Sequence, residues 1–281
     1  MGRIFRTWDL IGQSIAVLKS DKELLWLPIF SAIACVAVSV VMLSGGALVF
    51  LPQLRAAHAA RGPAQFTPAM LLFVFLFYLV NYFIVVFFNV ALVSIASNRL
   101  AGGHAVLNDG LQLAWQRKGK VLEWALLAAT VGILLRALEE RLSWLGRLMV
   151  DLVGIAWTLA TFFVVPLLAS EDLGPWEALS RSAELFRETW GEELVGGFSF
   201  GLIFMLLALP GLLLPLYGST LGPREMIFGT ILAVIYWLLL AVVNSTVQGI
   251  FMAALYGYAI TKSVPPGFNP DDLQQAWQPR S

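Results

Sequence analysis

The sequence predicts an all-α fold, a polytopic membrane helix bundle with six transmembrane helices in three parallel repeats. Hydrophobic residues make up 59% of the 281 residues and charged residues only 13%, whereas about a quarter of a soluble domain is charged. Six apolar runs are each long enough to cross a bilayer, which takes about 20 residues. The polar segments ahead of alternate runs share one helical pattern, and this predicts an internal repeat.

Composition also excludes several classes of function. The net charge is zero, so a basic surface for nucleic acid is not expected. Cys35 is the only cysteine, which excludes an intramolecular disulfide. His58 and His104 are expected in loops on opposite sides, and the sequence has no phosphate-binding glycine motif. We therefore expect no enzyme, no cofactor, no metal site and no nucleic-acid partner.

The first segment is expected to be helical. Its apolar residues recur at spacings of three and four, at Trp8, Ile11, Ile15 and Leu18. A helix lying on the membrane surface and a helix packed on the bundle fit this stripe equally well. The first span follows at residues 24–51, and its length far exceeds the apolar core of a signal peptide, so we expect it to be retained.

Five further spans and three outer loops complete the predicted order. The spans are expected at residues 69–97, 121–138, 148–169, 194–216 and 226–260. The outer connections are expected to be a loop at 52–68, a short charged turn at 135–147 and a short loop at 217–225. The sixth run exceeds one crossing, which predicts tilt or projection beyond the membrane.

The charges predict the orientation. An even number of spans places both termini on one side of the membrane. Of the 18 lysines and arginines, 12 fall in segments on that side and 6 in the opposite loops. Because basic residues are enriched in cytoplasmic loops, both termini are expected in the cytoplasm.

Shifting the chain along itself defines the repeat. A shift of 72 places Gly102 on Gly174 and Leu107 on Leu179, and a shift of 163 places Asn81 on Asn244. The unit is an amphipathic cytoplasmic helix, a span, an outer loop and a returning span. We predict one membrane domain, residues 1–262, with repeat units at about 1–98, 99–169 and 170–262, followed by a cytoplasmic tail at 263–281.

The clearest of the three cytoplasmic helices is expected after Gly174-Pro175, since proline suits the first helical position. Its apolar stripe is Trp176, Leu179, Ala183, Phe186 and Trp190. Acids outnumber arginines around this stripe, so anionic headgroups would repel the helix. We predict that it packs on the bundle or docks a partner through Trp176, Leu179, Phe186 and Trp190.

The run FFVVPLLASEDLGPWEALSRSAELFRETWGE, residues 162–192, resembles the signature of a family of uncharacterised bacterial six-span membrane proteins. That family is distantly similar to the membrane domain of some glycerophosphoryl diester phosphodiesterases and to YciC-like inner-membrane proteins. The resemblance implies a helical bundle in the inner membrane and carries no activity, because six spans leave no room for a phosphodiesterase domain.

Polar residues inside the spans are the remaining functional clue. The candidates are Asn81, Asn89, Asn244 and Gln248. Such groups line substrate pathways, or they form interhelical hydrogen bonds worth ~0.6 kcal/mol each. The structural role is the commoner one. Among charged residues, Asp151 is expected nearest to the membrane interior, with Arg136 as the partner available to it.

Two functions from different classes remain. The first is a non-enzymatic scaffold or assembly factor that docks partners on its cytoplasmic helices. The second is a transporter or lipid-handling protein with a cavity lined by Asn81, Asn244 and Gln248. The expected partners are membrane lipids and either another membrane protein or a second copy of the chain.

Overall fold

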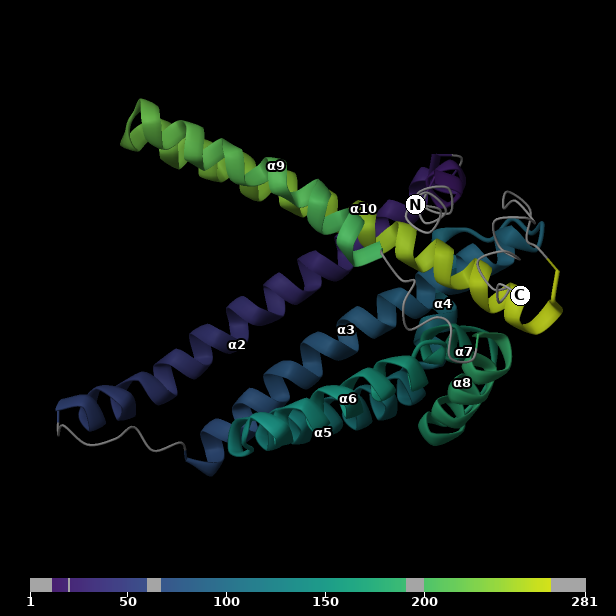
Figure 1. Ribbon diagram of the computed structural model, residues 1–281, viewed down its shortest axis with the longest axis horizontal. Helices are drawn as coiled ribbons and strands as arrows, with labels where there is room; N and C mark the ends of the chain where they lie inside the picture. The colour runs from purple at the N-terminus through teal and green to yellow at the C-terminus, as the bar shows by residue number, and fades with distance from the viewer. Residues whose placement is uncertain (1–11, 20, 60–66, 191–199, 264–281) are drawn as a thin grey trace. The chain divides into compact units, whose positions relative to one another are not determined.

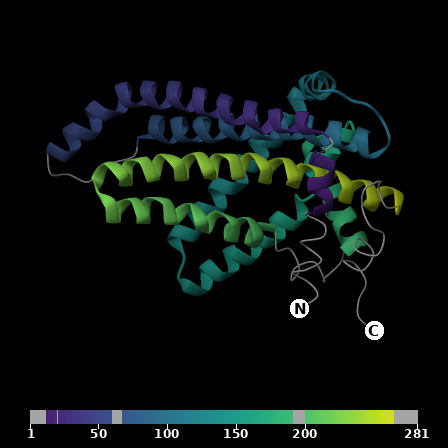
Figure 2. The same cartoon turned by 90° about the horizontal axis from the view of Figure 1, so that it is seen from above.

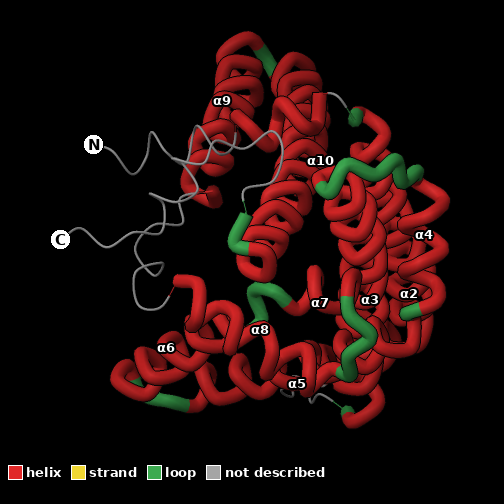
Figure 3. The backbone as a smooth tube through the Cα atoms, turned by 90° about the vertical axis from the view of Figure 1, so that its right-hand side faces the viewer, coloured by secondary structure: helices red, strands yellow, loops and turns green. Residues whose placement is uncertain are grey.

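A computed structural model describes residues 12–19, 21–59, 67–190 and 200–263 (Figure 1). Within these ranges all regular structure is helical (Figure 3). After helical residues 12–19 and a 3-10 turn η1 (Lys22–Leu25), the helices are α2 (Trp26–Ala59), α3 (Pro68–Leu100), α4 (Leu107–Gln116), α5 (Lys118–Arg141), α6 (Trp144–Ala160), α7 (Val164–Ser170), α8 (Pro175–Trp190), α9 (Phe200–Leu221) and α10 (Pro223–Thr261).

Among the residues that the structure describes, six helical stretches are long and apolar enough to cross a membrane. They are Lys22–Gln53, Pro68–Leu100, Lys118–Arg141, Gly146–Ser170, Phe204–Leu221 and Pro223–Thr261. The predicted six-span, all-helical, multi-pass membrane protein is therefore confirmed. Two consecutive spans form a hairpin. The base of the hairpin is the end at which the chain enters the first span and leaves the second. The tip is the end at which the chain turns from the first span into the second.

The chain forms two compact units, each assembled from separate stretches of sequence. Of the described residues, one unit takes those within 12–28, 92–110, 184–190 and 200–263, and the other takes those within 29–91 and 111–183. Helix α3 therefore belongs to both units: residues 92–100 lie in the first unit and residues 68–91 in the second.

In the first of these units, α9 and α10 run side by side (Figure 2). The loop predicted at residues 217–225 is wrong, because only Gly222 separates the two helices. Gly222 has φ 152°, a backbone angle that favours glycine, and Pro223 begins the next helix, where a missing N–H costs nothing. A Cβ on Gly229 would lie 2.4 Å from the Leu214 carbonyl oxygen, so this glycine allows the two backbones to touch.

Side chains of α10 also bind the backbone of α9. Trp237 donates its indole N–H to the Ala208 carbonyl at 3.0 Å, and the Tyr236 hydroxyl donates to the Leu207 carbonyl. Both acceptors precede Pro210 inside α9. Because unpaired polar groups are costly in a bilayer, these bonds hold the proline-containing segment against its neighbour.

The core of this unit brings together η1, the first residues of α2, the end of α3 and α10. Its largest fully buried side chains are Leu24, Leu27, Leu92, Ile95, Ile250 and Leu255. A Cβ on Gly249 would overlap Leu92, at 1.7 Å from its Cδ2. The glycine therefore permits this close approach of α10 to the end of α3.

In the second unit, α2 and α3 form the first hairpin. A Cβ on Gly46 would lie 2.5 Å from Phe73, and the Phe50 and Phe73 rings meet edge to face at 5.4 Å. The loop predicted from residue 52 is wrong, since α2 continues through Pro52 to Ala59. The residues after the proline are rich in alanine and other strong helix formers, which extend the helix.

The second hairpin of this unit consists of α5 and α6. The Trp124 and Trp157 rings stack near its base, 6.0 Å apart and 8° from parallel. The charged turn predicted at 135–147 is wrong, because α5 continues to Arg141 and α6 begins at Trp144. Glutamate and arginine are good helix formers, so the charges extend α5 instead of ending it.

The fourth span is not one continuous helix. It divides at a turn over Thr161–Phe163 between α6 and α7. Pro166 explains the break, since its ring and its missing N–H oppose a helix that would bond back to Phe162. The Phe163 N–H freed by the turn donates to the buried Ser182 hydroxyl of α8 at 2.9 Å. This bond docks α8 onto the break.

Candidate functional site

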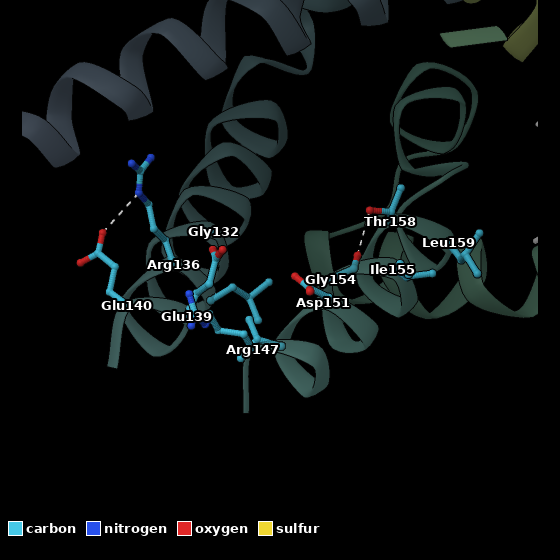
Figure 4. A pocket seen from close by; sticks show the side chains of 12 residues that line it. Gly132, Arg136, Glu139, Glu140, Arg147, Asp151, Gly154, Ile155, Thr158 and Leu159 are labelled. Atoms are coloured by element: carbon cyan, nitrogen blue, oxygen red, sulfur yellow. Dashed lines mark hydrogen bonds and ion pairs between the residues drawn. The ribbon is translucent and has the colours of Figure 1, made fainter. Parts of the chain in front are cut away.

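A groove of about 880 Å³ opens between α5 and α6 toward the tip of their hairpin (Figure 4). We call it the α5–α6 groove. It is lined by Gly132, Leu135, Arg136, Glu139, Glu140, Arg147, Val150, Asp151, Gly154, Ile155, Thr158 and Leu159. Sites for small molecules typically occupy about 300–1,000 Å³, so the groove is large enough for a ligand.

The groove changes in polarity along its length. Its charged side chains lie on the last turns of α5 and the first turns of α6. Toward the base, the wall consists of Gly132, Gly154, Ile155 and Leu159, with Thr158 as the polar exception. The Thr158 hydroxyl donates to the Gly154 carbonyl at 2.9 Å within its own helix. The groove is therefore charged at one end and mainly apolar at the other.

The charges within the groove are only partly paired. The Nε atom of Arg136 lies 3.6 Å from the Oε1 atom of Glu140, which is one turn further along α5. The suggested pairing of Arg136 with Asp151 is therefore wrong, since the i,i+4 neighbour on the same helix is closer to hand. Within the described ranges, Glu139, Arg147 and Asp151 form no ion pair within 4.0 Å. Figure 4 shows them between the two helix ends.

The base of the same hairpin is closed by polar contacts. One guanidinium nitrogen of Arg117 donates to the carbonyls of Leu168 and Glu171, at 2.6 Å each. The Lys120 ammonium lies 2.5 Å from the Asp172 carboxylate. This hydrogen bond, and the positive charge of Lys120, lower the pKa of Asp172 below its ordinary value of 3.8. The contacts tie the start of α5 to the end of α7.

A comparable contact joins the start of the first span to the end of the second. Arg99 forms an ion pair with Asp21 and a longer one, at 3.5 Å, with Glu23. Its Nε also donates to the Ala105 carbonyl at 2.8 Å. The base of this hairpin is therefore also closed by an arginine that satisfies backbone and carboxylate acceptors together.

The four polar residues predicted within the spans fall on two helices. Asn81 and Asn89 lie on α3, and Asn244 and Gln248 lie on α10. Asn81 donates to Phe77 on its own helix and accepts a 3.2 Å bond from Ser39 of α2. Asn244 accepts a 3.1 Å bond from Gln248.

Of the four residues, these bonds join only Asn244 and Gln248 to each other. The cavity expected around Asn81 and Asn244 stays a prediction. The observed bonds are of the interhelical and intrahelical kinds that stabilise spans.

Helix α8, the predicted docking helix, buries a face that differs from the predicted apolar stripe. Its fully buried residues are Ala178 and Ser182, with Leu185 and Phe186 nearly so. Leu179 is half-buried, the side chain of Trp190 lies outside the described residues, and Trp176 is 66% exposed. The bond from Phe163 to Ser182 fixes this rotation, and hydropathy alone had no means of detecting it.

The sequence analysis missed the α5–α6 groove, although a signal for it existed. Arg147, Asp151, Gly154 and Thr158 recur along α6 at spacings of four, three and four, which places polar and small residues on one helical face. This shared face is the feature of the sequence from which the groove is predictable.

A second groove, of about 590 Å³, lies at the tip of the α9–α10 hairpin. Its wall includes Tyr217, Arg224 and Glu225 among apolar residues. Among the described residues, no three histidines, cysteines or acids are grouped to hold a metal ion.

Residues 68–265 match the model of a family described as a family of unknown function, DUF6159. No curated protein and no solved structure matches the chain. The expected distant similarity to phosphodiesterase membrane domains and to YciC-like proteins therefore stays a prediction.

Proposed function

The chain belongs to the DUF6159 family, a family of unknown function, and we propose that it is a non-enzymatic scaffold or assembly factor of the inner membrane. One observation carries this proposal. Helix α8 is held by a buried hydrogen bond on one face, and its other face presents exposed Trp176 beside exposed acids. A large aromatic side chain on a rigid element is typical of the residues that dominate protein interfaces.

The chemistry of this face indicates its partner. Glu177 and Glu188 are exposed on α8, and Asp172 precedes the helix with 81% of its side chain exposed. An acidic surface attracts a basic one and repels anionic lipid headgroups. We infer a partner membrane protein with a basic segment next to its span, bound on the cytoplasmic side.

The threefold repeat is part of the same proposal. An ion pair closes the base of two hairpins, Asp21 with Arg99 and Lys120 with Asp172. These residues lie within a position or two of equivalence under the shifts that relate the repeats. The acid and the base are interchanged between the two pairs, since Arg99 corresponds to Asp172 and Asp21 corresponds to Lys120. This supports a shared arrangement of helices whose bases are closed by different side chains.

Crosslinking in native membranes tests the scaffold proposal. A photo-crosslinking amino acid at Trp176 should give one discrete protein adduct, and Glu188→Lys should abolish it by reversing an exposed acidic charge of α8 that the basic partner would contact. The matched control is the same amino acid at Trp115, which is 62% exposed on α4. Adducts with lipid alone at position 176 would contradict the scaffold role.

A second candidate function, lipid handling, is favoured by the α5–α6 groove. The cavity expected around Asn81, Asn244 and Gln248 stays a prediction. In contrast, the groove combines charged side chains and apolar walls within one membrane hairpin. Charged residues within spans are costly, and in membrane proteins they mark substrate and ion pathways.

A further inference from the structure

We propose that the α5–α6 groove binds a zwitterionic phosphate ester with a primary ammonium group, as the headgroup of an aminophospholipid, with the acyl chains toward the hairpin base. The proposal rests on lipid handling, the second proposed function, and is independent of the scaffold role. Three properties of the groove carry it: its depth, its charge and its walls.

Depth places the charges at the level of headgroups. Helix α5 has 24 residues and therefore spans about 36 Å, which exceeds the ~30 Å hydrocarbon core. Arg136 lies five residues from the end of α5, and Asp151 seven from the start of α6. At ~1.5 Å per residue these positions are about 8 and 10 Å from the tip, where headgroups meet hydrocarbon.

Charge selects the headgroup. The lining contains two arginines and three acids, so the groove carries a formal net charge of −1 and disfavours an anionic lipid. With Arg136 and Glu140 paired to each other, Arg147 is the cation for a phosphate, and Glu139 and Asp151 are the acceptors for an ammonium group. A headgroup with both charges satisfies all three residues.

The side chains that line the groove favour a primary ammonium group over a quaternary one. None of the twelve lining residues is aromatic, whereas quaternary ammonium groups are recognised by aromatic cages. Carboxylates instead accept hydrogen bonds from the N–H groups of a primary ammonium. Deeper in the groove, Gly132 and Gly154 have open space where a Cβ would project, and Ile155 and Leu159 continue the apolar wall. An acyl chain fits beside them.

Lipid binding by the purified full-length protein in detergent micelles tests the assignment. Native mass spectrometry would measure dissociation constants for phosphatidylethanolamine, phosphatidylcholine and phosphatidylglycerol, and for soluble glycerophosphoethanolamine. Phosphatidylethanolamine should bind about tenfold more tightly than the other two lipids, a difference of ~1.4 kcal/mol. The soluble headgroup should bind at least about a hundredfold more weakly, because it lacks the acyl chains.

Variants assign the binding to the groove. Asp151→Asn should remove the preference for ethanolamine over choline, and Arg147→Gln should weaken all three lipids. Gly154→Leu should weaken phosphatidylethanolamine binding at least about tenfold by filling the groove, at a glycine where an added Cβ meets no atom within 4 Å. The controls are Arg141→Gln, at the end of α5 outside the lining, and Gly45→Leu, at an equally open glycine of α2. Both should bind as the wild type does.

The experiment distinguishes failure of the aminophospholipid assignment from failure of the proposed lipid handling. Equal binding of the three lipids that Gly154→Leu abolishes would overturn the aminophospholipid assignment and leave lipid handling intact. Binding of the soluble headgroup as tightly as the lipid would overturn the lipid as its source. Lipid binding unaffected by Gly154→Leu would overturn both the site and the second proposed function.

Discussion

At the residue scale, Arg117 and Lys120 close the α5–α7 base by different physical means. Arg117 donates to two backbone carbonyls, whose acceptor strength does not change with pH. Lys120 binds the Asp172 carboxylate, which titrates. The two contacts should therefore respond differently to acid, although they lie at the same hairpin base.

The lowered pKa of Asp172 sets the sign of that response. A carboxyl group whose pKa is lower in the folded state stabilises the protein above its unfolded pKa, near 3.8, and loses this effect as pH falls through the folded value. We expect Lys120→Gln to lower the melting temperature in detergent slightly at pH 7 and to have no effect below the folded pKa.

Arg117→Gln is the control, and it should lower the melting temperature over the whole pH range. The expected cost is about 2 kcal/mol, since hydrogen bonds from charged donors are worth roughly 1.5–3 kcal/mol. A Lys120→Gln effect that persists in acid would show that the pair with Asp172 is not its source.

At the element scale, the decisive contact is the bond from the Phe163 N–H to Ser182, at the break between α6 and α7. We expect Ser182→Ala to destabilise the protein by about 1–3 kcal/mol, because it removes the buried hydroxyl that accepts the Phe163 N–H. It should also speed hydrogen exchange in α8, which the bond docks. Thermal unfolding and exchange mass spectrometry would measure both effects.

Ser180→Ala provides the matched control, because Ser180 lies on the same helix and is exposed. It changes the same atoms without leaving a buried group unpaired. Equal stability of the two variants would show that the bond does not dock α8.

The helices show which features of the fold can be predicted from the sequence. Hydropathy located all six spans, because a bilayer demands long apolar runs. It misplaced helix ends at Ala59 and Arg141, where polar but helix-forming residues continue the helix beyond the apolar run. The rotation of α8 depends on its bond to the turn before α7, which no hydropathy pattern encodes, whereas the α5–α6 groove leaves a signal in the polar and small residues along one face of α6.

At the scale of the whole molecule, we propose that both termini lie in the cytoplasm, because the number of candidate spans is even and 12 of the 18 basic residues fall in segments on one side. Cysteine labelling tests it directly, because Cys35 is the only native cysteine and Cys35→Ala gives a clean background. Ser180 on α8 and Ser219 near the α9–α10 tip are both exposed, and serine to cysteine is a small change.

We expect a membrane-impermeant maleimide to label Ser180→Cys only in inside-out vesicles and Ser219→Cys only in intact cells, because basic residues are retained on the cytoplasmic side. Labelling in the reverse pattern would invert the orientation and move the proposed α8 partner outside the cell. Labelling of both sites from one side would contradict the six-span topology itself, since α8 and the α9–α10 tip are separated by one crossing.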